Sequence, residues 1–103
     1  MGNEKNGGFP PFSGEIKNGY ILGRGASDMK GGLAGIISVM ELLAELEVEL
    51  NGTLTLTLVP DEETGGKFGI GWIMMQGIIK PDACIVAEPT GLTFIDIGQR
   101  GAL

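Results

Sequence analysis

Three groups of carboxylates are the residues of this sequence best suited to do chemistry. They are Asp28, the Asp-Glu-Glu run at residues 61–63, and Glu88. Carboxylates that converge can bind a divalent cation, and a carboxylate beside a water molecule can act as an acid or a base. Oxygen ligands alone favour a hard ion such as magnesium or calcium, because zinc usually takes histidine as well. These residues predict a cation site or an acid–base site if they meet.

Each group also has an ordinary structural interpretation. Asp28 lies between a glycine-rich turn and a predicted helix start, where aspartate is a frequent N-cap. Residues 61–63 can be a solvated charged loop, although three adjacent anions repel one another unless water or a cation compensates them. Glu88 can reach solvent at the end of an apolar strand, where burial without a partner would be costly. On the residues alone, both interpretations stay open for all three groups.

The composition excludes several kinds of function. The chain has 103 residues and a net charge of −6, with seven basic and thirteen acidic residues and no basic cluster, which argues against nucleic-acid binding. It contains no histidine, which removes Ser-His-Asp and Cys-His catalysis from this chain and also the commonest zinc ligand. The longest apolar stretch, residues 33–40, is too short to span a bilayer, so no membrane partner is expected.

Cys84 is the only cysteine, so no intrachain disulfide can form. A single unpaired cysteine is compatible with a reducing compartment, and we expect a cytoplasmic protein. Because Cys84 lies in an apolar run, the sequence predicts a buried structural thiol and not a nucleophile.

The apolar pattern predicts six elements that would position the carboxylates. They are a strand at 20–22, a helix over about 29–50, a strand at 53–59, a helix at 68–77, a strand at 83–87 and a strand at 92–97. Residues 1–18 are predicted as loop, and the continuous apolar run at 83–87 as a strand buried on both faces. This order predicts an α/β architecture with a mixed, partly parallel sheet, whose ligands sit beyond the carboxyl ends of strands. Asp28, residues 61–63 and Glu88 all occupy such ends.

Glycines interrupt the first predicted helix near its start. Gly31, Gly32 and Gly35 are poor helix formers, so we expect them to permit close packing in the first turns. Asn51-Gly52 is predicted to stop this helix.

Three segments, taken together and in order, resemble one protein family. They are residues 23–32 (GRGASDMKGG), 60–66 (PDEETGG) and 88–90 (EPT). Their order and spacing are similar to those of the acetylornithine deacetylase, succinyl-diaminopimelate desuccinylase and carboxypeptidase family of co-catalytic zinc hydrolases. The resemblance extends over nearly the whole chain. It implies a three-layer, zinc-exopeptidase-like α/β fold, of which residues 1–103 would be a partial catalytic domain.

The resemblance also implies a role for each carboxylate. Asp28 would bridge two metal ions, and Glu63 and Glu88 would each ligate one of them. Glu62 would be the general base in hydrolysis of an amide bond, in an N-acyl amino acid or a small peptide. The cofactors would be two divalent ions, zinc in the first place, with cobalt and manganese also suited. The family pattern further predicts a cis peptide bond between Asp28 and Met29.

The family pattern places two further metal-binding histidines outside this chain, one in a His-x-Asp segment upstream of Met1 and one far downstream. Each metal would therefore lack one ligand, and we expect the isolated chain to be inactive. The lid domain, expected just after Leu103, would also be absent, and with it the homodimer contact of the parent enzyme. Two alternatives remain: a non-catalytic metal-binding or interaction module using Asp28, Glu63 and Glu88, or a structural α/β fragment with solvated carboxylates.

Overall fold

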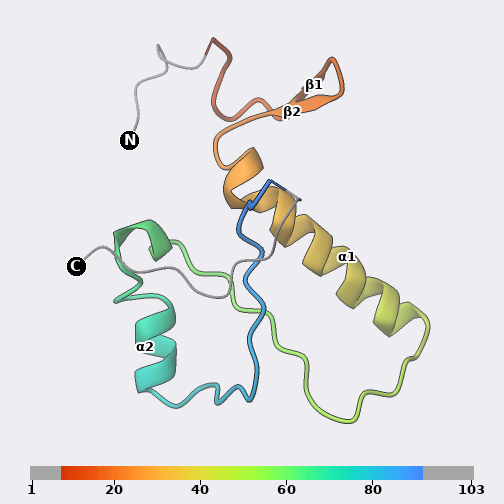
Figure 1. Cartoon of the computed structure of the whole chain (residues 1–103), viewed down its shortest axis with the longest axis vertical. Helices are drawn as coiled ribbons and strands as arrows, with labels where there is room; N and C mark the ends of the chain where they lie inside the picture. The colour runs from red at the N-terminus through yellow and green to blue at the C-terminus, as the bar shows by residue number, and fades with distance from the viewer. Residues whose placement is uncertain (1–7, 92–103) are drawn as a thin grey trace. The chain divides into compact units, whose positions relative to one another are not determined.

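The computed structural model describes residues 8–91, which form two compact units (Figure 1). The first unit comprises residues 8–48 together with 86–91, and the second comprises residues 49–85. The first unit contains strands β1 (Glu15–Lys17) and β2 (Tyr20–Leu22) and helix α1 (Gly31–Glu45). The second contains a short 3-10 helix, Glu62–Thr64, and helix α2 (Ile70–Met75).

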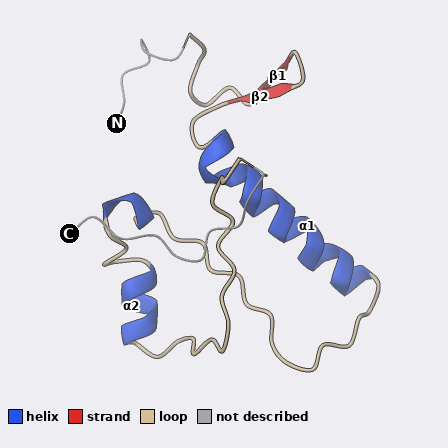
Figure 2. Ribbon diagram, viewed as in Figure 1, coloured by secondary structure: helices blue, strands red, loops and turns tan. Residues whose placement is uncertain are grey.

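Strands β1 and β2 form an antiparallel hairpin in which Ile16 faces Ile21 (Figure 2). The turn residues Asn18 and Gly19 both have positive φ, 53° and 81°, as a two-residue hairpin turn of the Asn-Gly type requires. The prediction of β2 is confirmed. The prediction of loop throughout residues 1–18 is wrong for β1, because the Asn-Gly turn pairs this short, largely polar segment with β2.

Contacts across the base of the hairpin tie it to the chain on both sides. The Arg24 amide donates a hydrogen bond to the Pro11 carbonyl (2.7 Å), and the Ser13 hydroxyl donates one to the Leu22 carbonyl (3.2 Å). The Arg24 guanidinium lies over the Phe12 ring, 5.4 Å from its centroid. These contacts hold together the two chain segments that flank the hairpin, the second of which leads into α1.

Helix α1 is confirmed, but it is shorter than the predicted span of 29–50. It ends before Asn51-Gly52, where the sequence predicted the stop. The Glu47 amide donates to the Ala44 carbonyl (3.1 Å), and the Val48 amide donates to the Leu43 carbonyl (3.0 Å). This pair of bonds, with Glu47 at φ 49°, is a Schellman ending in which glutamate takes the place usually held by glycine.

The predicted strands at 53–59 and 83–87 are not formed in the structure. A strand exists only where its backbone is paired, and the one sheet found within residues 8–91 is the β1–β2 hairpin. The partly parallel sheet is therefore absent from the described part of the chain, which is a small set of helices with a two-stranded sheet. The strand predicted at 92–97 lies outside the described residues.

Large apolar side chains are exposed in both units. Within residues 8–91 no hydrophobic side chain is buried, and Ile85 and Met75 are 86% and 80% exposed. Cys84 is exposed too, so the predicted buried thiol is wrong; the segment around it has no sheet to cover it. Among the described helices, none has the length and apolar character needed to cross a membrane.

Candidate metal centre

Asp28 lies in a turn, Ala26–Lys30, that leads into α1. The peptide bond between Asp28 and Met29 is cis, as predicted. Asp28 and Met29 have non-helical backbone angles, and the residue that precedes the first turn of α1 is Lys30. The interpretation of Asp28 as the N-cap of this helix is therefore wrong, and its carboxylate is exposed.

Lys30 and Gly25 close the turn around Asp28. The Lys30 amide donates to the Gly25 carbonyl (2.9 Å), and the Lys30 ammonium donates to the Arg24 carbonyl (3.1 Å). Gly25 has φ 72°, and a Cβ there would lie 3.2 Å from the Asp28 carbonyl oxygen and 3.3 Å from Lys30 Cε. Glycine is needed at position 25 for both its backbone angle and its lack of a side chain.

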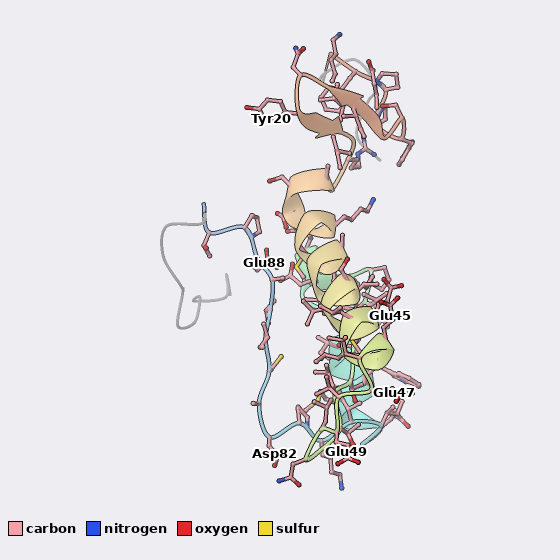
Figure 3. All side chains as sticks on the ribbon, turned by 90° about the vertical axis from the view of Figure 1, so that its right-hand side faces the viewer. Tyr20, Glu45, Glu47, Glu49, Asp82 and Glu88 are labelled. Atoms are coloured by element: carbon pink, nitrogen blue, oxygen red, sulfur yellow. The ribbon has the colours of Figure 1, made fainter. Side chains whose placement is uncertain are left out.

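Glu88 lies near the same end of α1, because its neighbour Ala87 packs against Gly32. A Cβ built on Gly32 would lie 2.7 Å from the Ala87 Cβ and closer still to the Ala87 carbonyl oxygen. The expected close packing is thus confirmed for Gly32, whereas a Cβ on Gly35 would meet nothing within 4 Å. Glu88 is half-buried beside the first turns of the helix (Figure 3). Asp28 and Glu88 therefore belong to one region of the first unit.

Glu62 and Glu63 are exposed residues of the 3-10 helix in the second unit. The preceding residue, Asp61, is half-buried, and its carbonyl accepts hydrogen bonds from the Thr64 amide (3.1 Å) and the Gly66 amide (2.8 Å). The Thr64 hydroxyl donates to the same carbonyl (3.0 Å). The run of three anions is thus not one solvated cluster, because Asp61 is half-buried whereas the two glutamates are exposed.

The carboxylates fit a cation in ligand type, but they do not form a complete metal site. In the part of the chain between residues 8 and 91, no three His, Cys, Asp or Glu side chains come together. Asp28 and Glu88 belong to the first unit, whereas Glu62 and Glu63 belong to the second. The sequence has no histidine, so these carboxylates provide oxygen donors only.

Two residues that shape these turns were missed by the sequence reasoning. The sequence reasoning included Lys30 only as part of the family-like segment 23–32 and gave it no separate role. It grouped Asp61 with the two glutamates. Nothing in residue type distinguishes Asp61 from Glu62. The signal lies further along the chain, in the buried Gly69, where a Cβ would overlap the Asp61 carboxylate.

Comparisons with known proteins identify the chain's relatives. A succinyl-diaminopimelate desuccinylase of Wigglesworthia glossinidia brevipalpis is 38% identical over 109 aligned residues, which cover 99% of this chain and 29% of that protein. The desuccinylase of Zymomonas mobilis subsp. mobilis is 41% identical over 101 residues, covering 90% of this chain and 26% of that enzyme. A desuccinylase of Coxiella burnetii is 38% identical over 109 residues, with coverage of 99% and 29%.

The chain spans between 26% and 29% of the length of these relatives. No solved structure matches it. The family model described as "Peptidase family M20/M25/M40" matches residues 2–99, which is nearly the whole sequence. The family resemblance of the three carboxylate segments is thereby confirmed, and the chain belongs to peptidase family M20/M25/M40.

Proposed function

We propose that this chain is the part of a larger hydrolase that supplies carboxylates to the catalytic centre. The reaction is cleavage of an amide bond in an N-acyl amino acid, of the desuccinylase or deacetylase kind, or in a small peptide. The observation that supports it is the 38% identity to a desuccinylase over 99% of the chain, a stretch that includes all three carboxylate segments. Because these relatives are desuccinylases, a succinylated substrate is favoured among these.

Three carboxylates act as metal ligands in this proposal. Asp28 would bridge two divalent ions, while Glu63 and Glu88 would each bind one. Zinc is the favoured metal, with cobalt and manganese as alternatives, and histidines from the rest of the enzyme complete the ligand sets. When bound, such a metal pair polarises a substrate carbonyl and lowers the pKa of a water molecule. The closeness of Asp28 and Glu88 to one end of α1 supports their joint role.

Glu62 is the general base. Its carboxylate accepts a proton from the attacking water and then delivers it to the amine nitrogen of the leaving group. One C–O bond forms and the amide C–N bond breaks, so the acyl group leaves as a carboxylate and the remainder as an amine. The exposure of Glu62 on a turn fixed by its neighbour Asp61 suits a group that must reach a bound substrate.

The parent enzyme has a three-layer α/β catalytic domain in this proposal. Residues 53–59 and 83–87 become strands of its partly parallel sheet by pairing with other parts of the protein. A separate lid domain provides the homodimer contact, and the enzyme works in the cytoplasm on a small-molecule or peptide substrate. Two features support the formation of these strands: the alternation of threonine and leucine at 53–59, and the exposed apolar run at 83–87.

The test is hydrolysis by the whole zinc-loaded protein. N-succinyl and N-acetyl amino acids and simple dipeptides are supplied, and the released amine is measured with a fluorogenic amine reagent. Glu62→Gln is expected to lower kcat by about 10²–10⁴-fold, because it removes the acid–base group. Its zinc content should stay unchanged, whereas Glu63→Gln and Glu88→Gln should each reduce bound zinc.

Glu41→Gln is the matched control, since Glu41 is an exposed glutamate of α1 and belongs to none of the three carboxylate segments. It should behave as the wild type. Failure of the whole protein to hydrolyse any of these substrates would reject the proposal. Retained zinc binding without hydrolysis would favour a non-catalytic metal-binding module.

A further inference from the structure

The Asp61 side chain is fixed by two backbone amides further along the chain. Its Oδ2 accepts hydrogen bonds from the Phe68 amide (2.8 Å) and the Gly69 amide (3.0 Å). Hydrogen bonds to a charged acceptor are about twice as strong as those between neutral groups. The other oxygen, Oδ1, is buried and has no hydrogen-bond partner among the described residues.

The space around this carboxylate is filled. Gly69 is buried, and a Cβ there would overlap Asp61 Oδ1 and lie 2.8 Å from the Val59 Cβ. The carboxylate therefore occupies a position from which its neighbours give it little room to move.

One residue thus holds both parts of the turn. The Asp61 carbonyl closes the 3-10 helix through Thr64 and Gly66, and the Asp61 carboxylate fastens the chain at Phe68 and Gly69. Glu62 and Glu63 are exposed and follow Asp61 directly. The backbone position of these two glutamates is consequently set by Asp61, whose side chain is held by hydrogen bonds within the protein.

We propose that Asp61 is a positioning residue that holds Glu62 and Glu63 where the reaction needs them. It touches neither metal nor substrate and acts through the backbone of the turn. The proposal rests on the proposed function for the roles of the two glutamates. What is new is that Asp61 contributes by fixing the turn, and not by adding a third negative charge to the run.

The test compares Asp61→Ala with Asp61→Asn in the whole zinc-loaded protein. Asparagine keeps one carbonyl oxygen to accept the Phe68 and Gly69 amides but removes the charge, whereas alanine removes the acceptor. Asp61→Ala should lower kcat by about 10–100-fold, as is usual for residues that orient catalytic or metal-binding groups, with little change in KM. Asp61→Asn should recover most of this loss. Asp82→Ala, at an exposed aspartate of the same unit, is the control and should match the wild type.

A second readout does not depend on activity. Amide hydrogen exchange at Phe68 and Gly69 should accelerate in Asp61→Ala and stay slow in Asp61→Asn. If Asp61→Ala does not fold, Gly69→Ala gives the same test, because its Cβ displaces the carboxylate without removing it. It should lower kcat and speed exchange at Phe68.

The outcomes separate the two proposals. If Glu62→Gln is impaired but Asp61→Ala keeps its kcat, the positioning role fails alone. A loss of kcat in Asp61→Ala with unchanged exchange at Phe68 and Gly69 also overturns it. If Glu62→Gln hydrolyses like the wild type, the proposed function fails, and faster exchange in Asp61→Ala then marks Asp61 as purely structural.

Discussion

Gly32 of α1 and Ala87 approach so closely that no side chain fits between them. A Cβ on Gly32 would lie 2.7 Å from the Ala87 Cβ. The contact joins the first turn of the helix to the segment that ends in Glu88. It brings the neighbourhoods of Asp28 and Glu88 together, although these two residues are far apart in the sequence.

Gly32→Ala is expected to destabilise the protein. The added methyl gains about 1 kcal/mol of helix propensity but overpacks against Ala87, which typically costs about 1–3 kcal/mol and displaces the Glu88 segment. The free energy of unfolding of the whole protein in urea should fall, and its bound zinc should fall with it.

Gly35→Ala is the matched control for this contact. It adds the same methyl to the same helix, at a position where nothing lies within 4 Å. It should raise the free energy of unfolding by about 0.5–1 kcal/mol and leave bound zinc unchanged. Equal effects of the two substitutions would contradict the contact between Gly32 and Ala87.

Gly25→Ala should disturb the Asp28 turn more than a comparable change elsewhere in the same unit. Both Gly25 (φ 72°) and Gly19 (φ 81°) have left-handed backbones, so alanine at either costs about 1–3 kcal/mol. Only at Gly25 does a Cβ also crowd the Asp28 carbonyl and the Lys30 side chain. Gly25→Ala should therefore lose more stability than Gly19→Ala in thermal unfolding, and it alone should release zinc. Zinc loss from both variants would argue against this local explanation.

Cys84 reports whether the apolar run at 83–87 becomes covered in the whole protein. In the described structure the thiol is exposed, so the separately produced 103-residue chain should react rapidly with a thiol reagent such as dithiobis-nitrobenzoate. In the whole protein the reaction should be much slower and should recover on denaturation. Fast labelling of the native whole protein would reject burial of this segment in a sheet.

The 103-residue chain on its own should bind zinc more weakly than the whole protein and should release no amine from acylated amino acids. The reason is that its described residues bring no three ligands together and that it contains no histidine. Calorimetric titration with zinc and the amine assay would measure both. Robust zinc-stimulated hydrolysis by this chain would contradict the expectation.

Local patterns predicted the elements that depend on neighbouring residues. The strand at 20–22 is confirmed, and α2 lies within the predicted span of 68–77, with Gly77 at φ 63° ending it. The start of α2 was misplaced because the Phe68 and Gly69 amides bind the Asp61 carboxylate. The end of α1 was misplaced because Glu47 takes a left-handed angle that glutamate seldom adopts.

Features that depend on distant partners were harder to predict. The residues at 53–59 have a strong strand pattern, yet a strand requires a paired neighbour, and the described residues give them none. For the site, residue types pointed to Asp28, the run at 61–63 and Glu88, and the resemblance separated their roles. Neither the residue types nor the resemblance could reveal that the Asp61 side chain is held within the fold. That depends on hydrogen bonds from two amides seven and eight residues away.

The turn held by Asp61 has a consequence for the order of folding. Its hydrogen bonds join residues at most eight apart in the sequence, and closing a loop of about ten residues takes only about 10–100 ns. Strand pairing for 53–59 must instead wait for distant segments, which is slow. We therefore expect the backbone of the turn at 61–69 to form early, and any strand pairing of residues 53–59 to follow it. In pulse-labelling during refolding of the whole protein, the Phe68 and Gly69 amides should gain protection before those of residues 53–59.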